Sequence, residues 1–199
     1  MWQKKIKTTP DVCILESLNF MDEDSHREGE VVYRTLKMSG KNPYYVYIRS
    51  RDEMEAFVEE FGKSEYRYLH ISCHGDTGTF FTTLDPIPSL DLVHMLAPHV
   101  NHRRVFLSTC LATDSKFATA LMKNSDCNSV TGPVGTLAFD DATIFWTAFY
   151  HLMFKESPAM KNVTIQEKLQ ICSSLVNEEF RFFFWHKQKI IEQTIKPFA

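Results

Sequence analysis

Hydrophobic positions along the chain alternate between short apolar runs and stretches in which apolar residues recur at helical spacing. Strands are predicted for the short apolar runs at residues 11–17, 44–50, 66–72 and 104–110. Helices are predicted for the amphipathic stretches that start near residues 25, 50, 89, 115 and 140. Capping-box patterns, which begin helices, occur as SHRE at 25–28, SRDE at 50–53 and TIQE at 164–167.

This alternation predicts right-handed βαβ crossovers and a mostly parallel sheet. The expected fold class is α/β, a three-layer sandwich with helices on both faces of the sheet. We expect one domain over residues 1–199, since 199 residues can build one sizeable core and no linker is visible. The pattern after TIQE predicts a C-terminal helix at about residues 164–195. This helix would include the aromatic segment FRFFFW (180–185), and we expect the segment either to cover the sheet or to dock a partner protein.

Composition and charge narrow the class of protein further. The net charge is −3 and no basic block is present, so neither nucleic acid nor an anionic membrane is expected as a direct partner. No apolar run is long enough for a membrane span, and the first residues lack a signal-peptide pattern, which makes a cytoplasmic location the expectation. The five cysteines have no regular spacing, so free thiols are expected.

Two predicted strands end in residues that can carry chemistry. LHISCHG ends a strand in His74 and Gly75, and VFLSTC ends the next strand in Cys110. The carboxyl ends of parallel strands share one edge of the sheet, and neighbouring strands lie about 4.8 Å apart. A thiol needs a nearby imidazole to become an effective nucleophile, and uncrowded backbone N–H groups can stabilise an oxyanion. Either motif alone favours a turn histidine and a buried thiol; together they favour a Cys-His dyad.

The sequence resembles the CHAT branch of the caspase-like cysteine peptidases, related to separase, caspases and gingipains. The resemblance covers about residues 66–154. It rests on LHISCHG, on FLSTCLAT and on the later segment GPVGTLAFDDATIFWTAFYHL. It implies a caspase-like fold in which His74 is the base and Cys110 the nucleophile, with the N–H groups of Gly75 and Cys110 as the oxyanion hole.

The same resemblance implies that Asp141 or Asp140 lines a pocket for a basic residue before the cut. Two departures affect this: Ala138 stands where the family usually has tryptophan, and LATD follows the cysteine where Glu-Thr-Gly is commoner. The two aspartates are also natural N-caps for the helix that follows, and we expect that role for at least one of them. Asp76 is assigned to substrate contact or orientation of the imidazole, with an exposed turn aspartate as the favoured alternative.

Other conspicuous residues have structural interpretations. Strand alternation turns Cys73 away from His74 and into the core, and His70 is expected to be a core histidine with satisfied hydrogen bonds. Metal is not expected, because His94 and His99 have no cysteine pair to complement them. No organic cofactor is implied.

The function predicted from the sequence is a cysteine endopeptidase that cleaves a protein partner, after a basic residue, in a bacterial defence or cell-death system. A regulatory protein partner is part of this expectation. The alternative is a non-catalytic caspase-like module that binds a partner through its C-terminal aromatic helix. A third hypothesis, a flavodoxin-type nucleotide binder, is disfavoured because the first strand is followed by the acidic stretch LESLNFMDEDSH and not by a glycine-rich turn.

Overall fold

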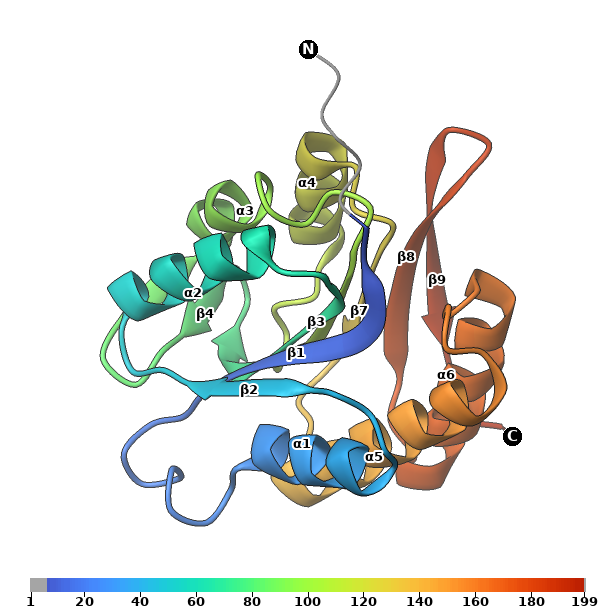
Figure 1. Cartoon of the computed structure of the whole chain (residues 1–199), viewed down its shortest axis with the longest axis horizontal. Helices are drawn as coiled ribbons and strands as arrows, with labels where there is room; N and C mark the ends of the chain where they lie inside the picture. Colours follow the sequence, from blue (N-terminus) through green and yellow to red (C-terminus); the bar gives the residue numbers. More distant parts are fainter. Residues whose placement is uncertain (1–6, 199) are drawn as a thin grey trace.

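A twisted sheet with helices on both faces makes up the fold in the computed structural model, which describes residues 7–198 (Figure 1). The main path of the sheet runs in the order β2-β1-β3-β6-β7-β8-β9. Its five parallel strands are β1 (Thr9–Ser17), β2 (Tyr44–Tyr47), β3 (Tyr66–Asp76), β6 (Arg104–Ser108) and β7 (Ser129–Pro133). Two antiparallel strands follow, β8 (Phe180–His186) and β9 (Lys189–Ile195). The expected α/β class with a mostly parallel sheet is confirmed.

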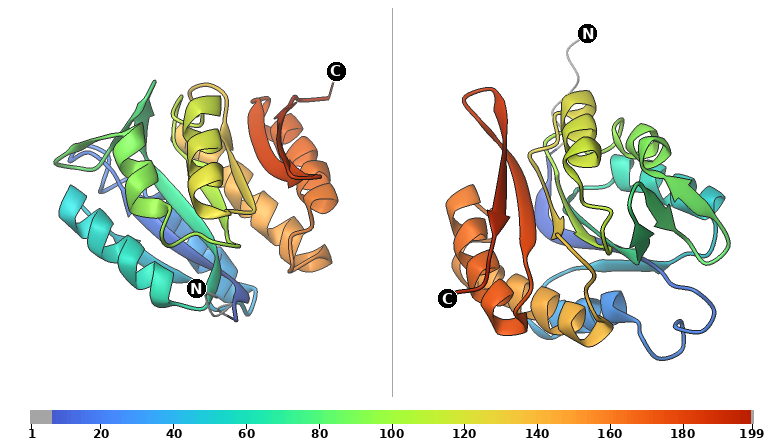
Figure 2. Two further views of the ribbon diagram at one scale, coloured as in Figure 1. Left: turned by 90° about the horizontal axis from the view of Figure 1, so that it is seen from above. Right: turned by 180° about the vertical axis from the view of Figure 1, so that it is seen from behind.

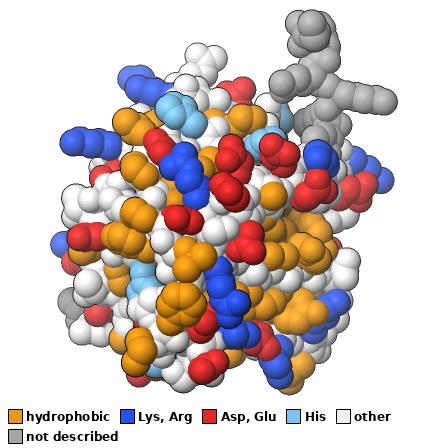
Figure 3. Space-filling model, turned by 90° about the vertical axis from the view of Figure 1, so that its left-hand side faces the viewer, with side chains coloured by type: hydrophobic (Ala, Val, Ile, Leu, Met, Phe, Trp, Pro, Cys, Tyr) orange, Lys and Arg blue, Asp and Glu red, His pale blue; other side chains and the backbone are white. Residues whose placement is uncertain are grey.

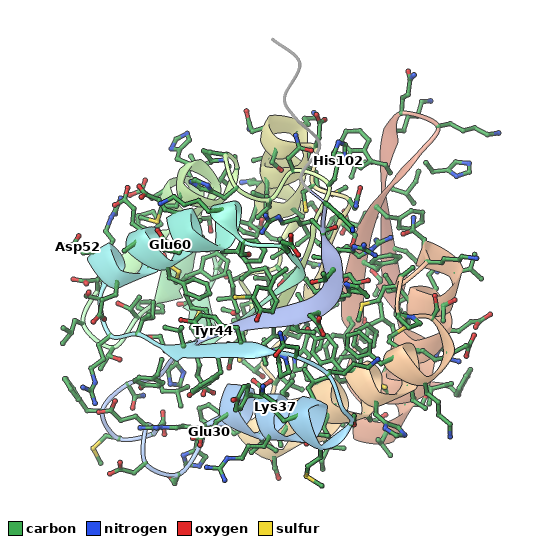
Figure 4. All side chains as sticks on the ribbon, viewed as in Figure 1. Glu30, Lys37, Tyr44, Asp52, Glu60 and His102 are labelled. Carbon is green, nitrogen blue, oxygen red and sulfur yellow. The ribbon has the colours of Figure 1, made fainter. Side chains whose placement is uncertain are left out.

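The two faces of the sheet are covered by different helices (Figure 2). One face carries α1 (Glu28–Met38), α5 (Phe139–Glu156) and α6 (Asn162–Val176). The other carries α2 (Arg51–Lys63), α3 (Ser89–Leu96) and α4 (Ser115–Ser125). Polar side chains such as Glu30 and Lys37 on α1 and Asp52 and Glu60 on α2 lie on the outer surfaces (Figure 4).

Strand parity decides which helices each side chain meets. Even-numbered residues of the central strands, such as Ile14, Tyr68 and Phe106, pack against the layer of α1, α5 and α6. Odd-numbered residues, such as Leu15 and Leu69, pack against α2, α3 and α4. Both sides of these strands are apolar because both sides are covered, as is usual for parallel sheets.

The end of β3 leaves the main sheet. Its pairing with β6 stops at Ser72 and Ser108, and the last residues of β3 pair instead with β4 (Thr79–Phe81), where His74 lies opposite Phe81. The short strand β5 (Pro86–Pro88) pairs with β4 and completes this small antiparallel unit. His74 therefore lies where β3 passes from one pairing partner to another.

The predicted C-terminal helix over residues 164–195 is wrong beyond α6. That helix ends at Val176, Asn177 adopts a left-handed conformation, and the aromatic segment forms β8. Phe180 and Phe182 are buried on one face of the sheet and Phe183 on the other. An apolar run covered on both faces lacks the alternation that distinguishes a strand from a buried helix. The C-terminal aromatic helix, through which the alternative non-catalytic module was expected to bind a partner, is therefore absent from the described residues.

Two of the three predicted capping boxes are also wrong. Ser50 caps α2 as predicted, with reciprocal hydrogen bonds to Glu53. Ser25 does not cap α1, which begins at Glu28, and its hydroxyl instead contacts the His26 ring at 2.9 Å. Thr164 lies inside α6, where its side chain is buried. In both cases the helix begins at a different residue from the one that the capping pattern indicates. A cap contributes only about 1 kcal/mol, so tertiary packing can override it.

Candidate active site

The carboxyl ends of β1, β2, β3 and β6 open onto one side of the molecule, which faces the viewer in Figure 3. Histidine, acidic and hydrophobic side chains share this surface. The loop after β1 contributes the exposed side chains of Phe20 and Met21, and the hairpin after β3 contributes Phe81. This is the edge at which open parallel sheets hold their sites.

His74 is held at this edge with about a third of its side chain exposed, 34%. The ring of Phe139, at the start of α5, packs against it edge-on with the centroids 5.6 Å apart. The exposed part of the imidazole is therefore available to a ligand, while the aromatic contact limits its rotation.

Cys110 follows β6 and is partly exposed. Its Sγ accepts a hydrogen bond from the Leu137 amide at 3.3 Å and lies 3.7 Å from the Leu137 carbonyl oxygen. Leu111 has a φ of 54°, so the chain turns in the left-handed region directly after the thiol. A leucine in that region is strained, and strain of this kind occurs often at functional sites.

Gly75 permits the two strand ends to approach each other closely. A Cβ atom at this position would lie 2.3 Å from Thr109 Cγ2 and 2.6 Å from the Cys110 carbonyl oxygen. Both distances are shorter than real Cβ contacts, so only glycine fits against the Cys110 backbone here. The expectation that Gly75 leaves the backbone uncrowded is wrong, because the backbone at this position packs tightly against Thr109 and Cys110.

The register of the strands places His74 and Cys110 at equivalent positions beyond the last paired residues of β3 and β6. The last β3–β6 pair joins Ser72 to Ser108, and continuing that register by two residues aligns His74 with Cys110. Both have the parity that faces α1 and α5, and both touch the segment that leads into α5: Cys110 through Leu137, and His74 through Phe139. Within residues 7–198, no hydrogen bond joins the imidazole to the thiol.

Two residues of the loop after β1 contact His74 and were not singled out from the sequence. Nε2 of His74 lies 2.9 Å from Asp22 Oδ2 and 3.2 Å from Asn19 Nδ2. The only signal was the acidic stretch directly after the first strand, at the same carboxyl edge. That stretch was used to argue against nucleotide binding, and its proximity to His74 depends on how the loop folds.

The three aspartates proposed for substrate binding occupy different positions. Asp140 is exposed and Asp141 partly exposed, both in the first turn of α5. The N-cap of that helix is Ala138, so the capping role expected for an aspartate is wrong, although Asp140 accepts a hydrogen bond from the Asp141 amide at 3.1 Å. Asp76 is exposed and accepts a hydrogen bond from the Thr77 amide.

The remaining thiols and the second histidine of β3 are buried. Cys73 belongs to the core on the α2–α4 side, as predicted, and burial raises its pKa to about 11. His70 is fully buried, with Nδ1 3.1 Å from the Tyr150 hydroxyl, so its predicted place in the core is confirmed. The expectation that its hydrogen bonds are satisfied is wrong for Nε2, which lies 3.3 Å from a Glu28 oxygen and makes no hydrogen bond within the described part of the chain. Cys110 is more accessible than the other four cysteines, all of which are buried.

No group of three or more histidine, cysteine, aspartate or glutamate side chains within residues 7–198 has the arrangement of a metal site. In the same part of the chain, no helix combines the length and the apolar character needed to cross a membrane.

The strand order, the two helical layers and the His-Gly and Cys strand ends define a caspase-like α/β fold. Among solved structures, the chain is similar to a secreted C11 cysteine protease from Bacteroides thetaiotaomicron, with a TM-score of 0.62 and 8% identity. That match covers 88% of this chain and 66% of the protease chain, just under two thirds. The chain is also similar to caspase-1 from Spodoptera frugiperda, with a TM-score of 0.56, 11% identity and coverage of 86% and 79%. No protein-family model matches the chain, and no curated protein matches it. At these identities the likeness establishes the fold.

Proposed function

We propose that the protein is a cysteine endopeptidase in which Cys110 is the nucleophile and His74 the general base and acid. The observation that carries this proposal is the packing of Gly75 against the Cys110 backbone, which brings the two strand ends together at the carboxyl edge. The caspase-like fold supports the same assignment, because both solved structures named above are described as cysteine proteases or caspases.

The proposed reaction follows from the chemistry of the two groups. His74 accepts the thiol proton as Cys110 Sγ attacks the scissile carbonyl carbon, and a tetrahedral oxyanion forms. The backbone N–H groups of Gly75 and Cys110 are proposed to stabilise that oxyanion. The protonated imidazole then donates its proton to the leaving amine, which leaves a thioester. Water activated by the neutral imidazole hydrolyses the thioester and restores the thiol.

The substrate preference is a further part of the proposal. Asp140 and Asp141 are acidic residues in the first turn of α5, three and four residues beyond the Leu137 contact with Cys110. Their closeness in the chain to Leu137, which contacts the nucleophile, supports a preference for Arg or Lys before the scissile bond. The exposed apolar side chains of Phe20, Met21 and Phe81 would contact the flanking residues of a peptide.

The proposed biological setting is supported by the resemblance to CHAT-type peptidases alone. It comprises a protein substrate in the cytoplasm, a regulatory protein partner and a bacterial defence or cell-death system.

A mixed peptide library tests the activity and its preference together. Wild type is expected to cleave after basic residues, and Cys110→Ala and His74→Ala are expected to lose cleavage while keeping the wild-type melting temperature. Asp140→Asn and Asp141→Asn, measured separately, identify the carboxylate that selects the basic residue through loss of that selectivity. If Cys110→Ala still cleaves the peptides that the wild type cleaves, the assignment of Cys110 as the nucleophile is wrong.

The runner-up is a caspase-like module that binds a partner without catalysis. The observation in its favour is the lack of a hydrogen bond between His74 and Cys110, whose sulfur instead contacts the Leu137 backbone. A folded protein that cleaves no member of the library and shows no labelling of Cys110 by a peptidyl electrophile would favour this alternative.

A further inference from the structure

The carboxylate of Asp22 faces the imidazole of His74 from a loop that is remote in sequence. Asp22 lies between β1 and α1, and its Oδ2 is 2.9 Å from His74 Nε2. The two side chains are 20% and 34% exposed. The contact is therefore partly shielded from water, and part of the ring remains exposed. None of the residues assigned to the dyad, the oxyanion hole or the substrate pocket explains this contact.

The loop holds Asp22 in place through hydrogen bonds of its own. Oδ1 of Asn19 accepts from the amides of Met21 and Asp22 at 2.9 and 3.0 Å. The Asp22 carbonyl accepts from the amides of Ser25 and His26 at 3.1 and 2.9 Å. The carboxylate is thus presented by a closed turn and not by a freely moving side chain on an open loop.

The hydrogen bonds of Asn19 fix the orientation of its own side-chain amide beside the His74 ring. Because Asn19 Oδ1 is already an acceptor, its Nδ2 must be the atom that lies 3.2 Å from Nε2. A proton on Nε2 suits Asp22, which only accepts, and a bare Nε2 suits Asn19, which would donate. The contact to Asp22 is shorter and charge-assisted, so it prevails.

We propose that Asp22 is a positioning residue for His74. The inference rests on the proposed peptidase function. Asp22 holds the proton on Nε2, so Nδ1 is the unprotonated nitrogen that accepts the thiol proton of Cys110. When the imidazole becomes protonated during the reaction, the same carboxylate stabilises its positive charge. Oδ1 of Asp22 also lies 3.5 Å from Nδ1 of His26, so this second imidazole shares the carboxylate at the surface.

The test compares Asp22→Asn with Asp24→Asn, which removes the same charge from an exposed position on the same loop. An asparagine at position 22 can turn its NH₂ toward the ring and favour the opposite tautomer. We expect kcat to fall about 10- to 100-fold in Asp22→Asn with little change in KM, and no change in Asp24→Asn. Equal melting temperatures of the two variants and the wild type establish that folding is unaffected.

A spectroscopic measurement keeps this inference separate from the peptidase proposal. Nitrogen-15 chemical shifts of the imidazole, assigned with His74→Gln, report the tautomer whether or not a peptide is cleaved. The wild type and Asp24→Asn are expected to carry the proton on Nε2, and Asp22→Asn to shift it toward Nδ1. An unchanged tautomer in Asp22→Asn would overturn the positioning role, even if Cys110→Ala abolishes cleavage. A faster reaction of Asp22→Asn would also overturn it, because the carboxylate would then be holding His74 away from the thiol.

Discussion

Glu16 places a carboxyl group in the interior at the end of β1, and the stability of the protein should depend on its proton. The side chain is fully buried. Oε1 accepts a hydrogen bond from the Gly29 amide at 2.7 Å, and Oε2 accepts one from the Tyr45 hydroxyl at 2.7 Å. Burial raises the pKa of Glu16 from 4.5 to about 7, although both hydrogen bonds oppose this shift. The carboxyl group is therefore partly protonated in the folded protein at neutral pH.

The sign and size of the effect follow from proton linkage. Between pH 4.5 and about 7 the folded protein binds more protons at Glu16 than the unfolded chain does. The free energy of unfolding therefore falls as the pH rises through this window. The stabilisation is fully present below the unfolded pKa and is lost above the folded pKa. At about 1.4 kcal/mol per pKa unit, the total is about 3 kcal/mol, of which about 2.5 kcal/mol is lost between about pH 5 and about pH 8.

Glu16→Gln removes the titration and keeps the shape of the side chain. The amide can accept from Gly29 and donate to Tyr45, so both hydrogen bonds have a replacement. Urea unfolding, followed by the fluorescence of the buried Trp146, measures the free energy of unfolding across the pH range. We expect the stability of the wild type relative to the variant to fall by about 2.5 kcal/mol from about pH 5 to about pH 8.

The control is Glu55→Gln, which removes a carboxylate from the exposed side of α2. We expect the stability of the wild type relative to this variant to change little over the same range, since exposed charges contribute weakly. The argument that burial raises the pKa of Glu16 would be refuted if the difference in stability between the wild type and Glu16→Gln stayed constant with pH.

Two further substitutions test the packing around the site and the anchoring of α2. Gly75→Ala is expected to lower the free energy of unfolding by about 1–3 kcal/mol and to reduce peptidase activity, because its Cβ would clash with the Cys110 carbonyl. The control Gly135→Ala, whose Cβ would meet no atom within 4 Å, should keep the wild-type melting temperature. Arg103 is buried and donates hydrogen bonds to three carbonyl oxygens at the carboxyl end of α2. Arg103→Met should cost about 3 kcal/mol or more in urea unfolding, and a loss below about 1 kcal/mol would contradict this anchoring role.

The sheet and the positions of His74 and Cys110 could be predicted from the sequence because strand periodicity and sheet geometry constrain both. A polar residue at the end of a buried apolar run must emerge at the carboxyl edge of a parallel sheet. The same parity argument correctly placed Cys73 in the core, and the position of His70 deeper in the strand correctly predicted its burial. These inferences need only the alternation of side chains along a strand and the order of the strands, and both can be derived from the sequence.

The contacts of Asp22 and the form of the C-terminal segment could not be predicted in this way. Asp22 reaches His74 through a turn closed by Asn19, and no periodicity encodes the path of such a loop. The segment from Phe182 to Trp185 is apolar at successive positions, which suits a buried helix and a strand covered on both faces equally well. Its pairing with β7 depends on an antiparallel neighbour that is distant in sequence.

The pairing of one thiol with one imidazole is tested most directly by covalent labelling with a peptidyl electrophile, followed by peptide mapping. Burial raises the pKa values of Cys13, Cys73, Cys127 and Cys172 to about 12, 11, 12 and 12, so these thiols are protonated and shielded at neutral pH. We predict a single adduct on Cys110 in the wild type and its loss in a folded His74→Ala variant. An adduct that forms on Cys110 at the same rate without His74, or one spread over several cysteines, would contradict the proposed dyad.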